Sequence, residues 1–587
     1  MLPLDLPGWV EALPVSVRPE PLGAGLAGGV VAVRLGDLAV VDGVAGPVLV
    51  ARTGDRSLMS GLADGELVAW CQVTAVAPVV FDRDGRLAAE GWLPDHVRLG
   101  VLEEHLGAGV VEQVIAQTQT ASQAAARAQA PADDDVAPGT ADADNADGPG
   151  PGNGKQRRQR VMSLELVARL VLAMTLMPQA SYVEALAQLV GLLPRLPWVR
   201  AWQVPSSTVI TAWRRLLGVD AMKAIFDRVA GHIVAATDPG ARWHGLRVCA
   251  LDGCQIRLPD TDENRAAFGS SGTTDDGADS PFPLARAVLG TARAGRAMLA
   301  AELDASWVGE QTLAHRLITE HPDLFTDECL YLVDRNFLSW AFVQAVHRGG
   351  HGAHLVARAK DGLKLPIVQR FGDGDYLSYL RSPDRRSRQT VRVVEYDLTQ
   401  PDGTVSEVFC LVTTLLDPDR HPAADIRDLY PQRWSASEST IGENKSTITA
   451  AGPSCGPILR STRPDLVRQE FWAWLAATQL VRRTAYAATK TTTGVGTDQI
   501  SFTTTRREAT RSMTQSLVTA TTAPAALADT ADRTARSILS TLITIQRDRH
   551  SAREQKYRPG FRHTSWTKTT TRGPLRINVG IPTADPT

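Results

Sequence analysis

The stretch Arg247-Val-Cys-Ala-Leu-Asp252-Gly253 decides the fold of this 587-residue chain. Its apolar run has the length and composition of a buried strand, and it ends in an aspartate followed by a glycine, which permits a sharp turn. Tyr331-Leu-Val-Asp334-Arg335-Asn-Phe337 repeats this arrangement. An aspartate that closes an apolar strand lies at the edge where open α/β sheets bind ligands. We therefore expect Asp252 and Asp334 to converge.

A third carboxylate stands late in the chain, in the stretch Tyr430-Pro-Gln-Arg433-Trp434-Ser-Ala-Ser-Glu438, with Lys445 beyond it. Carboxylates that meet within about 4 Å repel one another by about 4 kcal/mol per pair at an effective dielectric near 20, so such a cluster requires cations. Oxygen ligands select Mg2+ or Mn2+ over zinc. Two such ions can activate a water and stabilise the leaving oxygen during attack on a phosphodiester.

These three segments resemble the Asp, Asp and Glu boxes of insertion-sequence DDE transposases, specifically the YREK-signature group, the "IS-four" family. The family's remaining box residues follow in order along this chain: Leu258-Pro259-Asp260-Thr261, Asn264-Arg265, Phe268-Gly269, Asp334-Arg335, Phe337, Tyr430, Arg433, Glu438 and Lys445. The resemblance implies that Asp252, Asp334 and Glu438 are the catalytic residues and the ligands of two Mg2+ ions, with Mn2+ as a substitute.

The third box departs from the family pattern at one point. Four residues separate Arg433 from Glu438, where the family has three, and one residue corresponds to about 100° around a helix. The family spacing from Glu438 to Lys445 is retained, with six residues between them. We therefore expect the helix to begin after the extra residue, with Ser435 or Ser437 as its N-cap. The alternative is a degraded signature.

The resemblance implies an α/β fold with a ribonuclease H-like catalytic core, a mixed sheet flanked by helices, formed by residues 241–345 and 430–485. Within it, residues 284–303 have the pattern of two strands around Gly and Thr turn signals. Alternating strand patterns around a Pro-Asp-Gly turn at 401–403 predict a β-rich insertion at residues 346–429, before the catalytic glutamate.

Residues 161–240 are predicted to be helical, with a capping box at Ser181-Tyr-Val-Glu184. This block resembles the family's N-terminal domain, which binds the transposon end; a structural cap on the core is the alternative. The other predicted segments are a small β-rich added segment of unknown role, a helix, a disordered acidic linker that ends in a basic cluster, and a basic Thr/Arg-rich C-terminal region, at residues 1–95, 96–117, 118–160 and 486–587.

A cut-and-paste transposase is the function that the resemblance implies. Its partners would be double-stranded DNA, as terminal inverted repeats and target, and a second copy of the chain in the synaptic complex. Candidate DNA-binding residues are Tyr430, Arg433, Trp434, Lys445, Arg335, Arg358, Lys360, Arg214 and Arg215. For Arg358 and Lys360 a solvated basic face is an equal alternative. Two other hypotheses are an inactive DNA-end-binding relic and a structure-specific ribonuclease H-like nuclease.

Whole-chain properties bound these hypotheses. The net charge of −2 does not itself indicate DNA binding, although the acidic linker offsets basic patches elsewhere. The six cysteines lack the two-residue spacing typical of zinc sites and redox pairs, so we expect them to be reduced and buried. The sequence shows no signal peptide and no apolar segment long enough to span a membrane, so we expect a cytoplasmic, nucleoid-associated protein.

Overall fold

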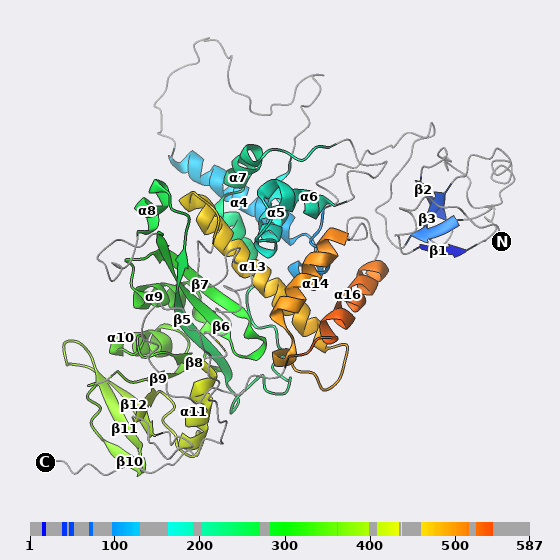
Figure 1. Ribbon diagram of the computed structural model, residues 1–587. Coiled ribbons are helices and arrows are strands. Elements are labelled where there is room, and N and C mark those ends of the chain that lie inside the picture. Colours follow the sequence, from blue (N-terminus) through cyan, green and yellow to red (C-terminus); the bar gives the residue numbers. More distant parts are fainter. Residues whose placement is uncertain are drawn as a thin grey trace, which may run out of the picture. The chain divides into compact units, whose positions relative to one another are not determined.

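A computed structural model describes residues 15–18, 38–43, 46–51, 70–73, 97–129, 162–191, 202–269, 282–360, 362–397, 408–433, 436, 459–515 and 524–543 (Figure 1). The chain divides into two compact units. Unit 1 comprises residues 1–228 and 510–531, and unit 2 comprises residues 229–509 and 532–587. No helix within the described ranges is both long and apolar enough to cross a membrane.

The centre of unit 2 is a mixed sheet in which the strand order is β10-β11-β12-β13-β9-β8-β5-β6-β7. β5 pairs antiparallel with β6 and parallel with β8, and β8 pairs parallel with β9. The half of the sheet that holds the site consists of β5 (Arg247–Arg257), β6 (Leu284–Ala292), β7 (Met298–Ala305), β8 (Cys329–Val333) and β9 (His354–Arg358). Counted along the chain, these five strands are ordered 3-2-1-4-5. The predicted ribonuclease H-like sheet is therefore confirmed.

Helices cover both faces of this sheet. One face packs on α9 (Glu310–Glu320) and α10 (Trp340–Gln344), in a core that includes Leu251, Leu313 and Phe342. The other packs on α11 (Ala423–Leu429), in a core that includes Val248, Leu332 and Ile426. Successive residues of a strand point to opposite faces, which explains why Val248 and Leu251 lie in different cores.

The insertion extends the sheet on the far side of β9. It consists of β10 (Gln369–Gly372), β11 (Asp375–Arg381), β12 (Arg388–Tyr396) and β13 (Phe409–Thr413), and each strand pairs antiparallel with the next. β13 in turn pairs antiparallel with β9. A buried ion pair joins β11 to β12, because Arg392 Nε and Nη2 each lie 2.6 Å from a carboxylate oxygen of Asp375. Arg392 also donates to the carbonyl of His421.

The long helix α13 (Pro464–Thr489) connects several parts of unit 2. Its Gln479 accepts from the backbone N–H of Met298 on β7 and donates to the carbonyl of Gly231, both at 2.8 Å. Trp472 and Trp474 are buried, as expected for core residues. Near the end of α13, Ala485 and Ala488 pack against Ile538 of α16 (Pro524–Leu539).

Unit 1 contains the predicted helical block. Its helices are α3 (Val101–Leu106), α4 (Val110–Gln129), α5 (Leu164–Leu176), α6 (Tyr182–Val190) and most of α7 (Ser207–Val229). Arg169, buried on α5, makes ion pairs of 2.7 Å with Glu103 and 2.9 Å with Glu112, which joins α5 to α3 and α4. Ser181 caps α6 as predicted, and Gly218, with φ 79°, interrupts α7.

The segments before this block agree only in part with the sequence. A small sheet of order β1-β4-β3-β2 is formed by β1 (Val15–Arg18), β2 (Leu38–Gly43), β3 (Gly46–Ala51) and β4 (Trp70–Val73). α4, however, continues to Gln129, into the segment assigned to a disordered linker. The reason is that its last turns are rich in alanine and glutamine, which favour helix even without a large apolar face. Most of the acidic segment, residues 130–161, lies outside the described residues.

We expect Arg392→Met to destabilise the insertion by about 3–5 kcal/mol, because it leaves the buried Asp375 carboxylate without its cation. Chemical denaturation and hydrogen exchange of β11 and β12 measure this. The double variant Arg392→Met, Asp375→Leu should recover most of the loss. Arg316→Met, which removes an exposed ion pair with Asp304, is the control and should change little. Equal effects of Arg392→Met and the control would contradict this account.

Candidate active site

The parallel pairing of β5 and β8 places two aspartates side by side. Leu251 of β5 pairs with Val333 of β8 in this register. The residues that follow them are Asp252 and Asp334, respectively. Neighbouring strands lie about 4.8 Å apart, and residues in register point to the same face. Both aspartates therefore lie on the face that packs on α11. Asp252 is largely buried, with 14% of its side chain exposed.

β5 does not turn after Asp252, contrary to the expectation from Asp252-Gly253. It continues to Arg257, with Asp252 opposite Leu289 and Gly253 opposite Val288 of β6. Gly253 instead allows a close approach: a Cβ atom there would lie 2.5 Å from Glu310 Cδ and 2.6 Å from Glu310 Oε1. A glycine inside a strand commonly marks such an approach.

Glu310 is a third acidic side chain at this point, and it is not among the site residues expected from the sequence. It is the first residue of α9. Burial raises the pKa of Glu310 above its ordinary value, Arg286 opposes this, and the charges of Asp334 and Asp252 raise that pKa further. The two aspartates are thus close enough to act on Glu310 electrostatically. The available signal in the sequence was the combination of a glycine inside an apolar strand and an acidic residue at a helix start.

Tyr430 and Arg433 are buried beside the aspartates. The Tyr430 hydroxyl donates to the carbonyl of Val333, 3.1 Å away, which fixes the residue just before Asp334. Arg433 Nη1 lies 3.6 Å from Asp252 Oδ2, and both side chains are largely shielded from solvent. In this structure Tyr430 and Arg433 therefore hold the aspartates in place. This differs from the predicted contacts with phosphate, because neither side chain is open to solvent.

The chain beyond Arg433 is anchored to the same region of the sheet. The Thr291 hydroxyl of β6 donates to the carbonyl of Ala436 at 2.9 Å, and Thr291 pairs with Ala250, two residues before Asp252. Ala436 stands two residues before Glu438 in the sequence. The predicted site residues Trp434, Glu438 and Lys445 lie outside the described residues.

The rest of the first box forms a capped helix beside the site, α8 (Asp262–Phe268). Thr261 caps it by accepting from the backbone N–H of Asn264, and the Thr261 hydroxyl donates to the carbonyl of Thr462. The Asn264 amide donates to the carbonyls of Pro259 and Ser461. These box residues therefore fasten the end of β5 to the chain that leads into α13.

Comparisons with known proteins identify the family of this chain. The N-terminal domain of the insertion element 4 transposase matches residues 152–227. Transposase InsG for insertion sequence element IS4 of Escherichia coli (strain K12) is 31% identical over 322 residues, which are 54% of this chain and 70% of that protein. The chain belongs to the IS4 family of transposases.

Two further similarities are looser. The putative transposase InsZ of Escherichia coli (strain K12) is 26% identical to this IS4-family chain over 162 residues, 28% of the chain and 52% of that protein. A solved structure of a piggyBac transposase synaptic complex with hairpin DNA covers 65% of this chain and 79% of its own, at 9% identity and a TM-score of 0.34.

The predicted DNA-binding cations of this IS4-family transposase occupy different surroundings. Arg335, Lys360 and Arg215 are exposed. The guanidinium of Arg358 lies over the ring of Phe409, 4.4 Å from its centroid. Arg214 is fully buried, and its guanidinium lies 5.0 Å from the centroid of the Tyr182 ring. In this structure Arg214 is thus covered by Tyr182 of α6, an arrangement that disfavours the predicted contact with DNA phosphate.

The donor set fits the divalent cations that a DDE transposase implies. Carboxylate oxygens are hard ligands, which Mg2+ and Mn2+ prefer. The charges of Asp252 and Asp334 act on Glu310, while Arg286 counters the charge of Glu310 and Arg433 lies 3.6 Å from Asp252. Repulsion between partly buried carboxylates is relieved when cations bind between them.

We expect Glu310→Gln to raise the thermal midpoint in the absence of divalent cations at neutral pH. A carboxyl whose pKa is raised by folding binds more protons in the native state than in the unfolded state, so its ionisation destabilises the fold as pH rises above 4.5. The gain should disappear when the pH falls below 4.5. Thermal scans of both proteins across this range measure it, with Glu320→Gln at the exposed end of α9 as control. A gain that persists at low pH would contradict the electrostatic cause.

Proposed function

We propose that this transposase cleaves and joins DNA at the ends of its own element, with Asp252, Asp334 and Glu438 as its catalytic carboxylates. The register of β5 with β8 carries the proposal, because it sets Asp252 and Asp334 next to each other in a chain of the IS4 family. Bound Mg2+ ions would supply a Lewis acid that activates water and stabilises the leaving oxygen. Mn2+ is expected to substitute for Mg2+.

The residues around the aspartates have positioning roles in this proposal. Arg433 orients Asp252 through their ion pair, and Tyr430 fixes the backbone at Val333 from the buried side. Thr291 holds the chain at Ala436, close before Glu438 in sequence. Rigid presentation of this kind matters because phosphodiester cleavage depends on the alignment of the attacking oxygen with the leaving oxygen.

The substrates in this proposal are the terminal inverted repeats of the element and a target DNA, and a homodimer holds two ends together. The helical block of unit 1 binds the repeat, in keeping with the match of residues 152–227 to the family's N-terminal domain. Arg335 and Lys360, exposed in unit 2, contact the phosphates near the cleavage point. Such a protein acts at the nucleoid of a bacterial cell.

We expect Asp252→Asn, Asp334→Asn and Glu438→Gln each to abolish cleavage of a labelled repeat-end DNA in Mg2+ while end binding is retained. Each change keeps the side-chain shape and removes the charge that holds the cations. Gel separation of nicked and intact DNA measures cleavage, and a mobility shift measures binding. Asp425→Asn, an exposed acid on α11, is the control. Full cleavage by any of the three variants would refute the assignment.

The unmodified protein distinguishes the other two hypotheses in the same assay. Binding of the repeat without any nicking in Mg2+ or Mn2+ would indicate an inactive end-binding relic. Cleavage that is equally efficient on DNA without the repeat would indicate a nuclease. Cleavage that requires the repeat and is followed by joining to a second DNA supports the transposase mechanism.

We expect Arg215→Gln to weaken repeat binding and to lower the slope of log affinity against log salt by about 0.9, the value for one lost phosphate contact. Arg215 is exposed on α7. Lys223→Gln is a matched control on the same helix, because that ammonium already lies 3.4 Å from Asp227. Fluorescence anisotropy at several salt concentrations measures both slopes. An unchanged slope for Arg215→Gln would exclude a phosphate contact.

A further inference from the structure

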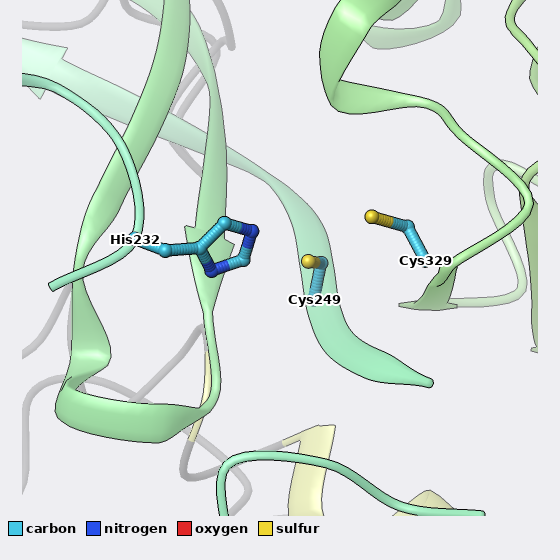
Figure 2. Close-up of side chains that lie close together, drawn as sticks. All are labelled: His232, Cys249 and Cys329. Atoms are coloured by element: carbon cyan, nitrogen blue, oxygen red, sulfur yellow. The ribbon is translucent and has the colours of Figure 1, made fainter. Parts of the chain in front are cut away.

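A cluster of soft metal ligands lies near the start of β5 and β8, the two strands that lead to the aspartates. Ligand atoms of His232, Cys249 and Cys329 all lie within 4.8 Å of one another (Figure 2). Cys249 is on β5, Cys329 begins β8, and His232 lies on the chain between α7 and β5. Their sequence separation explains why cysteine spacing gave no sign of the cluster.

The cluster is built on a rigid frame. The carbonyl of Gly231, next to His232, accepts from Gln479 at 2.8 Å, and the Gly231 N–H donates to the carbonyl of Met298 at 2.9 Å. Both cysteines are buried in the core under α9 and α10. The Cys329 sulfur lies 3.7 Å from the Thr326 hydroxyl. Ligands whose backbones and neighbours are fixed in this way need little reorganisation to bind an ion.

The strand register argues against a disulfide bond between Cys249 and Cys329. Cys249 pairs with Tyr331 and Cys329 pairs with Arg247, so the two cysteines are offset by two residues on adjacent parallel strands. An offset of about 6.6 Å along strands about 4.8 Å apart separates their Cα atoms by about 8 Å. Disulfides rarely form when the Cα atoms are more than about 7 Å apart. The thiols lie on the same face of the sheet, where an ion between them can bridge the distance.

The chemistry of the ligand set selects the ion. Two thiols and an imidazole are typical zinc ligands, whereas Mg2+ and Mn2+ prefer oxygen. Zinc–sulfur bonds of about 2.3 Å place tetrahedral ligand atoms about 3.7 Å apart, so the cluster needs only a small contraction. The hydrogen bond from Cys249, together with one from His232, lowers the pKa of Cys329 to about 4 against the opposing effect of burial. Zinc binds cysteine as the thiolate, because the bound ion itself deprotonates a coordinating thiol.

We propose that His232, Cys249 and Cys329 bind one Zn2+ ion that clamps the start of β5 to the start of β8, with water in the fourth position. This site is separate from the carboxylates and differs from them in metal preference. Its role is structural: it fixes the register of the two strands on which the positions of Asp252 and Asp334 depend.

The test uses Co2+ as a spectroscopic probe on the full chain, purified under reducing conditions and stripped of metal. Co2+ bound by thiolates gives a sulfur-to-metal charge-transfer band in the near ultraviolet, which oxygen ligands do not give. We expect this band at one equivalent of Co2+, and we expect Zn2+ to displace it. Cys249→Ser and Cys329→Ser should each weaken binding by more than about 100-fold, since loss of a second-shell partner alone costs 10–100-fold. Cys410→Ser, at a free cysteine on β13, is the control and should bind normally.

X-ray absorption of the Zn2+-loaded native protein gives a second readout that does not depend on the folding of any variant. It should show two sulfur ligands at about 2.3 Å and one nitrogen at about 2.0 Å. A zinc shell of oxygen and nitrogen only, a charge-transfer band unaffected by loss of both cysteines, or a Cys249–Cys329 disulfide in the native protein would each overturn the proposal.

Discussion

The parallel pairing of β5 with β8 is the constraint on which the active site depends. The register Leu251 to Val333 makes Asp252 and Asp334 neighbours, although 81 residues separate them in the sequence. Parallel strands need a crossover between them, and β6, β7 and α9 form it. The same crossover places the side chain of Glu310, the first residue of α9, against the backbone of Gly253. The parallel pairing of β5 with β8 and its crossover therefore assemble the acidic cluster. The helices on both faces of the sheet keep this cluster largely buried.

The surroundings of the aspartates explain, in physical terms, the Tyr and Arg positions of the YREK signature, which are the two that the structure describes. Tyr430 and Arg433 are buried, and they contact the backbone before Asp334 and the carboxylate of Asp252. Their spacing in the signature follows from the turn after α11, which places both on the same side of the sheet. The motif thus records a packing arrangement around the carboxylates as much as a set of groups for DNA. In the first box, Thr261 caps α8, and Thr261 and Asn264 fasten this helix to the chain just before α13.

The two ends of the stretch over which β5 pairs with β8 carry different chemistry. Hard oxygen ligands gather where β8 ends, and the softer sulfur and nitrogen atoms of Cys249, Cys329 and His232 gather where β8 begins. The strand between them is buried and apolar, with Ala250 and Leu251 fully covered. Because a packed strand is stiff, whatever fixes its start also fixes the position of Asp252 a few residues on.

The sequence by itself determined the strand pattern of the core, the two aspartates, the insertion and the cap at Ser181, because apolar periodicity and capping are local properties. It did not determine that β5 runs past Gly253, that Glu310 joins the aspartates, that Arg214 and Arg433 are buried, or that His232 meets two cysteines. Those facts depend on contacts between residues distant in sequence. Side-chain type and spacing do not specify such contacts; strand register and helix packing do.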